Sequence, residues 1–130
     1  PLGGPVVEVC AVAKRDLKTG EVLDEYGMYT TYGEAVNAEE MSDRRYLPEG
    51  LVEGCSLRRD VPKDQVLTYD DVELPAGRLA DRLRAEQYRH FRGDTWLEER
   101  LHGVAGVVGP HGDRELVEVG KYKTPTAWAT

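Results

Sequence analysis

Residues 11–24 read AVAKRDLKTGEVLD, and residues 55–68 read CSLRRDVPKDQVLT. Both stretches run from apolar residues through a basic–acidic pair and a turn into a Val-Leu segment. The identical positions are Arg15, Asp16, Val22 and Leu23 in the first copy and Arg59, Asp60, Val66 and Leu67 in the second. A unit present only twice is not a solenoid, which needs roughly three or more stacked units. The repeat therefore predicts a pseudo-two-fold within one domain, built from two strand–turn–strand units.

The composition is that of a soluble globular protein. Of the 130 residues, 40% are hydrophobic and 32% are charged, which is ordinary for this class. We expect a β domain over residues 1–75, a helical extension over 76–103 and a hairpin or tail over 104–130. The sequence has no run long enough to span a membrane and no secretory signal, so a cytoplasmic location is predicted. Because the methionines are Met28 and Met41, we also expect further protein upstream of Pro1.

The charge distribution disfavours nucleic acid as a partner. The formal net charge is −7, and the acidic excess lies in residues 1–75, where the repeat is. Proteins that bind nucleic acid carry clustered Lys and Arg on a basic surface. Neither nucleic acid nor a membrane is therefore an expected partner.

The two cysteines have no metal-binding or redox spacing. Cys10 and Cys55 stand far apart in the sequence, without the short pairing of a zinc ribbon or a Cys-x-x-Cys motif. Reduced, buried thiols are favoured because no signal peptide is present. The sequence leaves a disulfide between them open.

The segments outside the repeat predict a loop and two helices. Residues 25–54, between the copies, are rich in turn residues, and such long connections often carry function. They are the first candidate for a ligand-facing surface. After Pro75 the apolar period becomes 3.6 and predicts a helix that ends at Gly93, with a solvated arginine-rich side. Its apolar face would contain Leu79, Ala80, Leu83, Gln87 and Phe91. A second short helix would begin with a capping box of Thr95 and Glu98.

No constellation of catalytic residues is recognisable. The three histidines all lie after residue 89, and no metal triad has a familiar spacing. No serine lies in a Gly-x-Ser-x-Gly elbow, and no Gly-x-Gly-x-x-Gly dinucleotide motif follows a strand. We therefore predict that this chain alone does not catalyse a reaction.

Four segments of the chain are distinctive: KRDLKTGEVLD (14–24), Tyr32-Gly33, LPEGLVEG (47–54) and RRDVPKDQVLTYDDVELP (58–75). Together they resemble the C-terminal SAF domain of homoserine-dehydrogenase-like oxidoreductases. SAF domains are related to type III antifreeze proteins and to the antifreeze-like domain of sialic acid synthases. The resemblance implies a mainly β, β-clip fold with an internal pseudo-two-fold, followed by one or two C-terminal helices. It agrees with the repeat.

The same resemblance implies an accessory role. The family has an upstream Rossmann-type domain that binds NAD(P), and no cofactor site is expected in the present chain. The β-clip domain would help to close the substrate site or to build a homo-oligomer. Substrate identity stays open. The alternative is a stand-alone module that binds a sugar acid or a phosphorylated small molecule. Ice binding and pilus or flagellar assembly, known elsewhere in the superfamily, are disfavoured by the charge density and by the lack of an export signal.

The candidate binding residues come from two places. The family's Tyr-Gly segment implies a site at Tyr32, Gly33 and Glu34. Lys14 and Arg58, from the repeated basic–acidic pairs, would bind a carboxylate or phosphate of a small anionic substrate. The competing interpretation of these pairs is structural, because Asp16 and Asp60 stand just before turns, where Asp caps backbone N–H groups.

Overall fold

The computed structural model describes residues 3–102 of the chain. The chain divides into two compact units. One is Pro5–Pro75, and the other runs from Ala76 onward and includes the N-terminal residues up to Gly4. Each unit is described by itself. The predicted hairpin or tail over residues 104–130 lies outside the described residues.

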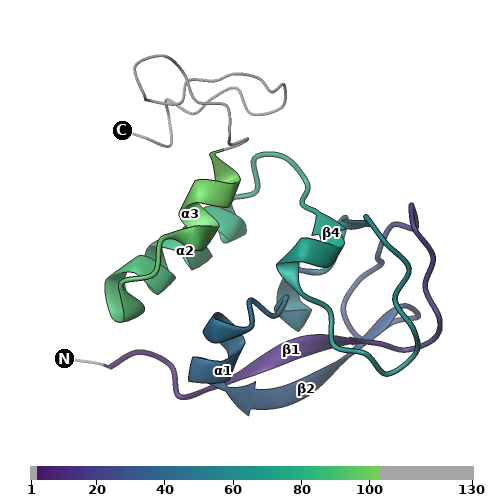
Figure 1. The fold of residues 1–130 in the computed structure, drawn as a ribbon, viewed down its shortest axis with the longest axis horizontal. Coiled ribbons are helices and arrows are strands. Elements are labelled where there is room, and N and C mark those ends of the chain that lie inside the picture. Colours follow the sequence, from purple (N-terminus) through teal and green to yellow (C-terminus); the bar gives the residue numbers. More distant parts are fainter. Residues whose placement is uncertain (1–2, 103–130) are drawn as a thin grey trace. The chain divides into compact units, whose positions relative to one another are not determined.

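The first unit is built on a two-stranded ribbon (Figure 1). Strand β1 (Val7–Ala13) pairs antiparallel with β2 (Thr31–Asn37), from Val7 opposite Asn37 to Ala13 opposite Thr31. The other edge of β1 forms single bridges from Cys10 to Pro48 and from Val12 to Val66. Strand β1 is therefore the central strand, with parts of the connection and of the second copy beside it.

Short elements complete this unit. They are the helix α1 (Ala38–Asp43), the 3-10 turns η1 (Glu49–Leu51) and η2 (Tyr69–Asp71), and the strands β3 (Ser56–Leu57) and β4 (Val72–Glu73). Strands β3 and β4 pair with each other. Much of the connection over residues 25–54 thus has regular structure, in β2, α1 and η1, where the sequence predicted mainly loop.

The backbone hydrogen bonds repeat about a pseudo-two-fold axis. At the axis, Leu17 of the first copy and Val61 of the second occupy equivalent positions and exchange both backbone hydrogen bonds, at 2.8 and 2.9 Å. The Ala13 N–H donates to the Gln65 carbonyl, and the Leu57 N–H donates to the Glu21 carbonyl. The two bonds are equivalent, because Ala13 and Leu57 occupy the same position of the repeat, as do Glu21 and Gln65. The repeat in the sequence is therefore a repeat in space.

Each copy caps the turn of the other. The Asp60 Oδ1 accepts hydrogen bonds from the Thr19 N–H and hydroxyl at 2.8 and 2.9 Å. In the reciprocal contact, the Asp16 Oδ1 accepts from the Lys63 N–H at 2.8 Å. The turns also share a left-handed residue, Gly20 at φ 90° and Asp64 at φ 69°. The two aspartates thus serve the turns, and their targets lie in the opposite copy.

The core lies between the copies and beneath the ribbon. Its largest fully buried side chains in this unit include Leu17, Leu23, Met41, Leu47, Val61, Leu67 and Tyr69. Cys10 and Cys55 are both buried and unpaired with each other. Burial raises the pKa of the Cys10 thiol to about 11. Residues 5–75 form a mainly β domain of the β-clip kind with an internal pseudo-two-fold, and helices follow in the chain, so the predicted fold class is confirmed.

The described part of the second unit, up to residue 102, contains the helices α2 (Leu79–Arg92) and α3 (Trp96–Leu101), which contact each other. Helix α2 ends as predicted, with Gly93 left-handed at φ 71°. The predicted buried face is wrong, because Leu79 is 60% exposed and Leu83 and Phe91 are exposed as well. The buried side chains of α2 are Asp81, Ala85 and Tyr88.

Local partners explain which face of α2 is buried. The Tyr88 ring lies 5.4 Å from the Trp96 ring between centroids, so α3 contributes an aromatic partner. Asp81 accepts two hydrogen bonds from the Arg78 guanidinium, at 2.9 and 3.0 Å. Burial raises the pKa of Asp81, and the Arg78 charge opposes that rise. A paired carboxylate can be buried where an unpaired one could not.

The predicted capping box at the start of α3 is also wrong. The Thr95 hydroxyl donates to Glu99 at 3.0 Å, and Glu98 pairs with Arg89 at 3.1 Å. A capping box forms instead at η2, where the Thr68 and Asp71 side chains bond reciprocally. No helix within residues 3–102 has the length and apolarity needed to cross a membrane.

Candidate functional site

The loop that follows the first copy is the most distinctive part of the repeat domain. It runs from Glu25 to Tyr29, between Asp24 and Thr30, and β2 follows it. The second copy continues instead into the compact turn from Thr68 to Asp71. In both places a carboxylate bonds a threonine, Asp24 with Thr30 and Asp71 with Thr68. A carboxylate–threonine hydrogen bond thus joins the two ends of both segments, and the segment after the first copy is the longer one.

Asp24 ties the end of the loop to its beginning. Its Oδ2 accepts from the Tyr29 N–H at 3.0 Å, and its Oδ1 accepts from the Thr30 N–H at 3.2 Å and from the Thr30 hydroxyl. Partial burial raises the pKa of Asp24, but these hydrogen bonds outweigh it and hold the pKa below its usual value. Asp24 is therefore an ionised anchor at neutral pH.

Glu49 is a second, buried anchor. It belongs to η1 and is only 7% exposed. Its Oε2 accepts from the Gly27 N–H at 2.8 Å and from the Thr31 hydroxyl at 3.2 Å. Its Oε1 is buried with no hydrogen-bond partner among the described residues. Burial raises the pKa of Glu49, while the two hydrogen bonds and the Lys14 charge act in the opposite direction.

Gly33 makes room for this anchor. A Cβ atom at Gly33 would lie 2.6 Å from Val9 Cγ1 and 3.4 Å from Glu49 Cγ. The first distance is a steric overlap with a β-branched side chain that has little freedom to move. The absence of a side chain at Gly33 thus lets Val9 and Glu49 lie over the same part of β2. This is a structural role for one of the predicted site residues.

Lys14 holds the far side of the loop. Its backbone N–H donates to the Thr30 carbonyl at 2.9 Å, and its ammonium donates to the Met28 carbonyl. The loop backbone is thus held by Lys14, Asp24 and Glu49 together. Lys14 was predicted to bind an anionic substrate, and in the structure its ammonium contacts the loop.

The side chains at the tip of the loop face solvent. Tyr26 is 66% exposed and Tyr29 is 73% exposed, and Met28 is exposed as well. Gly27 between them is left-handed at φ 75°. Exposed tyrosines and methionines are enriched at binding surfaces, whereas scattered exposed apolar residues are common. Here they are concentrated on one anchored loop, which we take as the candidate site.

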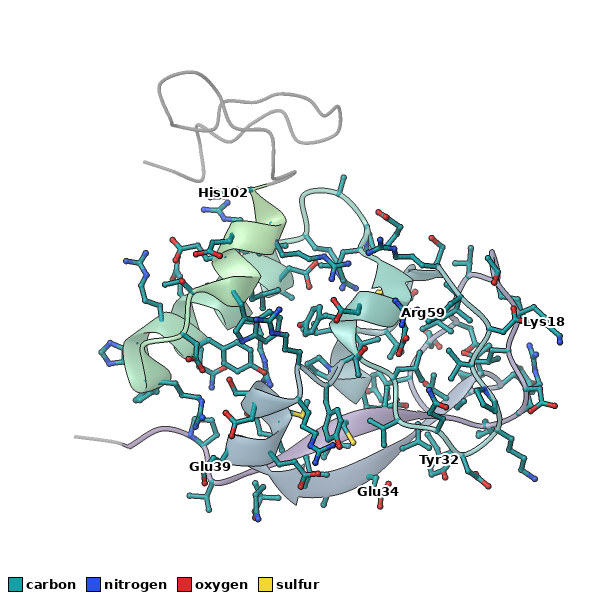
Figure 2. The ribbon with its side chains drawn as sticks, viewed as in Figure 1. Lys18, Tyr32, Glu34, Glu39, Arg59 and His102 are labelled. Atoms are coloured by element: carbon teal, nitrogen blue, oxygen red, sulfur yellow. The ribbon has the colours of Figure 1, made fainter. Side chains whose placement is uncertain are left out.

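The other predicted site residues lie elsewhere. Tyr32 and Glu34 follow one another on the same side of β2 (Figure 2), opposite to Gly33 because side chains alternate along a strand. The Tyr32 hydroxyl donates to Asp64 at 2.9 Å, and this bond raises the pKa of Tyr32. Arg58 pairs loosely with Glu73 at 3.8 Å. The structure therefore brings Lys14 and Gly33 to the Glu49 anchor, but gives Tyr32 and Arg58 separate partners.

The remaining members of the basic–acidic pairs also have local partners. Arg15 pairs with Glu21 at 2.9 Å, and Arg59 contacts Asp71 at 3.4 Å. The second copy has Gln65 where the first has Glu21, so Arg59 uses a different carboxylate. Arg15 and Arg59 thus contact carboxylates of their own domain.

Two kinds of reactive group can be assessed in the described residues. No group of His, Cys, Asp and Glu within residues 3–102 is arranged to hold a metal ion. The Cys10 thiol is buried, and its pKa of about 11 disfavours the reactive thiolate. Sequence reasoning missed Asp24, Glu49 and the exposed loop residues. The sequence did point to this region, because the Tyr26-Gly27 pair lies in residues 25–54, the connection that was expected to face a ligand.

No protein-family model matches the chain, and no curated protein matches it in sequence. Among solved structures, the chain is similar to the flagellar protein FlgA from Thermotoga maritima MSB8, with a TM-score of 0.44 and 26% identity. The match covers 55% of this chain and 27% of that one. At this TM-score the similarity supports no assignment.

Proposed function

We propose that residues 5–75 are a non-catalytic binding module, and that the loop from Glu25 to Tyr29 contacts another domain or a partner protein. The observation that carries the proposal is the combination of a restrained backbone with exposed side chains. Lys14, Asp24 and Glu49 bond the loop backbone, while Tyr26 and Tyr29 project into solvent.

The physical advantage of such a loop is low entropy cost. Ordering a flexible loop on binding opposes association, and a loop already held in place avoids most of that cost. Tyrosine then supplies a large contact area with few rotatable bonds. An anchored loop with two exposed tyrosines is thus suited to recognition.

The larger protein in this proposal is an NAD(P)-dependent oxidoreductase of the homoserine-dehydrogenase-like kind. The support is the sequence resemblance of the repeat, the LPEGLVEG segment and the Tyr-Gly pair. NAD(P) would be bound by an upstream Rossmann-type domain, and the present module would help to close the substrate site or to form a homo-oligomer. A cytoplasmic location is part of the proposal, in keeping with two cysteines that are not joined by a disulfide.

The gene and the full-length enzyme test this role. The reading frame upstream of the Pro1 codon should encode a glycine-rich βαβ unit, and a frame without one would contradict the oxidoreductase assignment. In the full-length enzyme, Y26A and Y29A should lower kcat/KM or weaken the oligomer, measured by steady-state kinetics and by light scattering. Val6→Ser is the matched control, since Val6 is exposed and outside the loop. Equal effects of all three variants would contradict the assigned contact.

A stand-alone module for a small anionic ligand is the second candidate, carried by Lys14 and Arg58. The structure offers it less support. The Lys14 ammonium already donates to the Met28 carbonyl, and Arg58 contacts Glu73. Calorimetric titration of the chain with sugar acids and sugar phosphates decides between the two. Binding that is lost in both K14A and R58A would favour the anionic ligand.

A further inference from the structure

The surroundings of the loop are acidic. Glu25 belongs to the loop, Asp24 precedes it, and the Glu49 carboxylate accepts a hydrogen bond from the Gly27 N–H. The Lys14 ammonium is engaged by the loop backbone, since it donates to the Met28 carbonyl. The whole chain has 24 acidic and 17 basic residues. Glu25 is an exposed carboxylate next to Tyr26 in the sequence, and it favours a positively charged ligand.

The exposed tyrosine rings favour the same class of ligand. The face of an aromatic ring carries partial negative charge and attracts a cation placed over it. Arginine combines this stacking with a planar fork of donors that matches a carboxylate. A guanidinium group therefore satisfies both features of the loop, the rings of Tyr26 and Tyr29 and the acidic side chain of Glu25.

We propose that the loop from Glu25 to Tyr29 binds an arginine-bearing, extended segment of a partner protein or domain, with guanidinium groups stacked on Tyr26 and Tyr29. This inference rests on the binding role proposed above and names its chemistry. Charge complementarity selects the occupant, because an acidic segment would meet Asp24 and Glu25. A purely apolar segment would bring no group to pair with the exposed Glu25 carboxylate.

The experiment is a titration of the isotope-labelled full chain, followed through its amide signals by NMR. The probe is a short peptide of alternating glycine and arginine. The matched peptide carries citrulline, which keeps the shape of arginine and most of its donors but has no charge. The amide signals of Gly27 and Tyr29 should shift with the arginine peptide, and the citrulline peptide should bind at least several-fold more weakly.

Variants separate the loop from general electrostatic attraction. Y26A and Y29A should each lower the affinity for the arginine peptide by roughly threefold, as expected for an exposed cation–π contact. E25Q should weaken it as well. E39Q removes the same charge from α1, beyond the Asn37 end of the ribbon, whereas the loop joins the Thr31 end. Figure 2 shows Glu39 at the end of the domain opposite Lys18. E39Q should leave the affinity unchanged.

Each contrary result overturns the inference in a different way. Equal binding of the citrulline peptide at the same amides would preserve the binding role of the loop but exclude recognition through charge. Equal weakening by E25Q and E39Q would reveal non-specific attraction. If neither peptide shifts the loop amides, recognition of arginine is excluded. The binding module itself is judged by the enzyme variants above, because they do not depend on the peptide.

Discussion

After the first copy of the repeat the chain continues into an anchored loop, and after the second copy it continues into a 3-10 turn. Both segments close with a bond between a carboxylate and a threonine. The tyrosine of the turn, Tyr69, is fully buried, whereas the two tyrosines of the loop, Tyr26 and Tyr29, are exposed. Where the two copies agree, residues stabilise the axis. Where they diverge, the first copy presents side chains to solvent.

The axis itself gives the largest expected effect. Leu17 and Val61 are fully buried and exchange their backbone hydrogen bonds. L17A should cost about 3 kcal/mol of unfolding free energy and V61A about 2 kcal/mol, through lost burial and the cavity left behind. Urea unfolding followed by circular dichroism measures both. V6A, at an exposed position, should stay within about 0.5 kcal/mol. If L17A left the unfolding free energy unchanged while V61A lowered it, the two copies would not be equivalent.

Glu49, which anchors only the first of the two segments, comes next. E49A leaves the Gly27 N–H and the Thr31 hydroxyl without their acceptor and should cost about 2 kcal/mol. E49Q keeps an acceptor and removes the buried charge. If E49Q at pH 8 lost as much unfolding free energy as E49A, the charge of Glu49 itself would be required for stability.

The pH dependence of E49Q has a definite sign. Because the pKa of Glu49 is raised in the folded state, its contribution to stability is fully present below the unfolded pKa of about 4.3. It is lost as the pH rises through the folded pKa. Wild type should therefore lose stability relative to E49Q between acidic and neutral pH. Parallel stability curves for the two proteins would contradict the raised pKa.

The reciprocal caps predict a smaller and unequal pair of effects. Asp60 accepts two hydrogen bonds from Thr19, and Asp16 accepts one from Lys63. D60A should therefore lower the melting temperature more than D16A. The Thr19 N–H, followed by its hydroxyl, lowers the pKa of Asp60, so its stabilisation is present above the unfolded pKa of about 3.9. It fades as the pH falls through the folded pKa. The gap between D60A and wild type should close in acid, and a constant gap would count against the cap.

The exposed tyrosines should matter least for stability. Y26A and Y29A should each change the unfolding free energy by less than about 0.5 kcal/mol, because their side chains face solvent. Chemical denaturation measures this difference. A loss above 1 kcal/mol in either variant would mean that the ring supports the fold, and the contrast with the buried turn after the second copy would disappear.

The repeat made the fold class and the pseudo-two-fold predictable, because both copies keep Arg-Asp and Val-Leu at the same offset. The targets of the capping aspartates were not predictable, since Asp16 bonds Lys63, a residue distant in the sequence. Strand β2 was not predicted from the sequence, because the Tyr32-Gly33 pair is typical of a turn. Gly33 is in fact extended, and its missing side chain accommodates Glu49.

The helical unit shows the limit of periodicity. Leu79, Leu83 and Phe91 share a face by spacing, but the Arg78–Asp81 pair and the Tyr88–Trp96 contact bury a different one. Apolar spacing does not reveal that a paired carboxylate can be buried. In the loop, the anchors Asp24 and Glu49 are likewise brought together only by tertiary structure.

The reciprocal turn caps also bear on how two molecules of this protein could associate. Because the capping aspartates and the Leu17–Val61 hydrogen bonds join one copy to the other, two chains that exchanged their second copies would keep these contacts across the axis. The connection between the copies would then serve as the hinge, which is the geometry of a domain-swapped dimer. A fold in which each half contacts the other in this way is thus compatible with a closed, two-fold symmetric dimer.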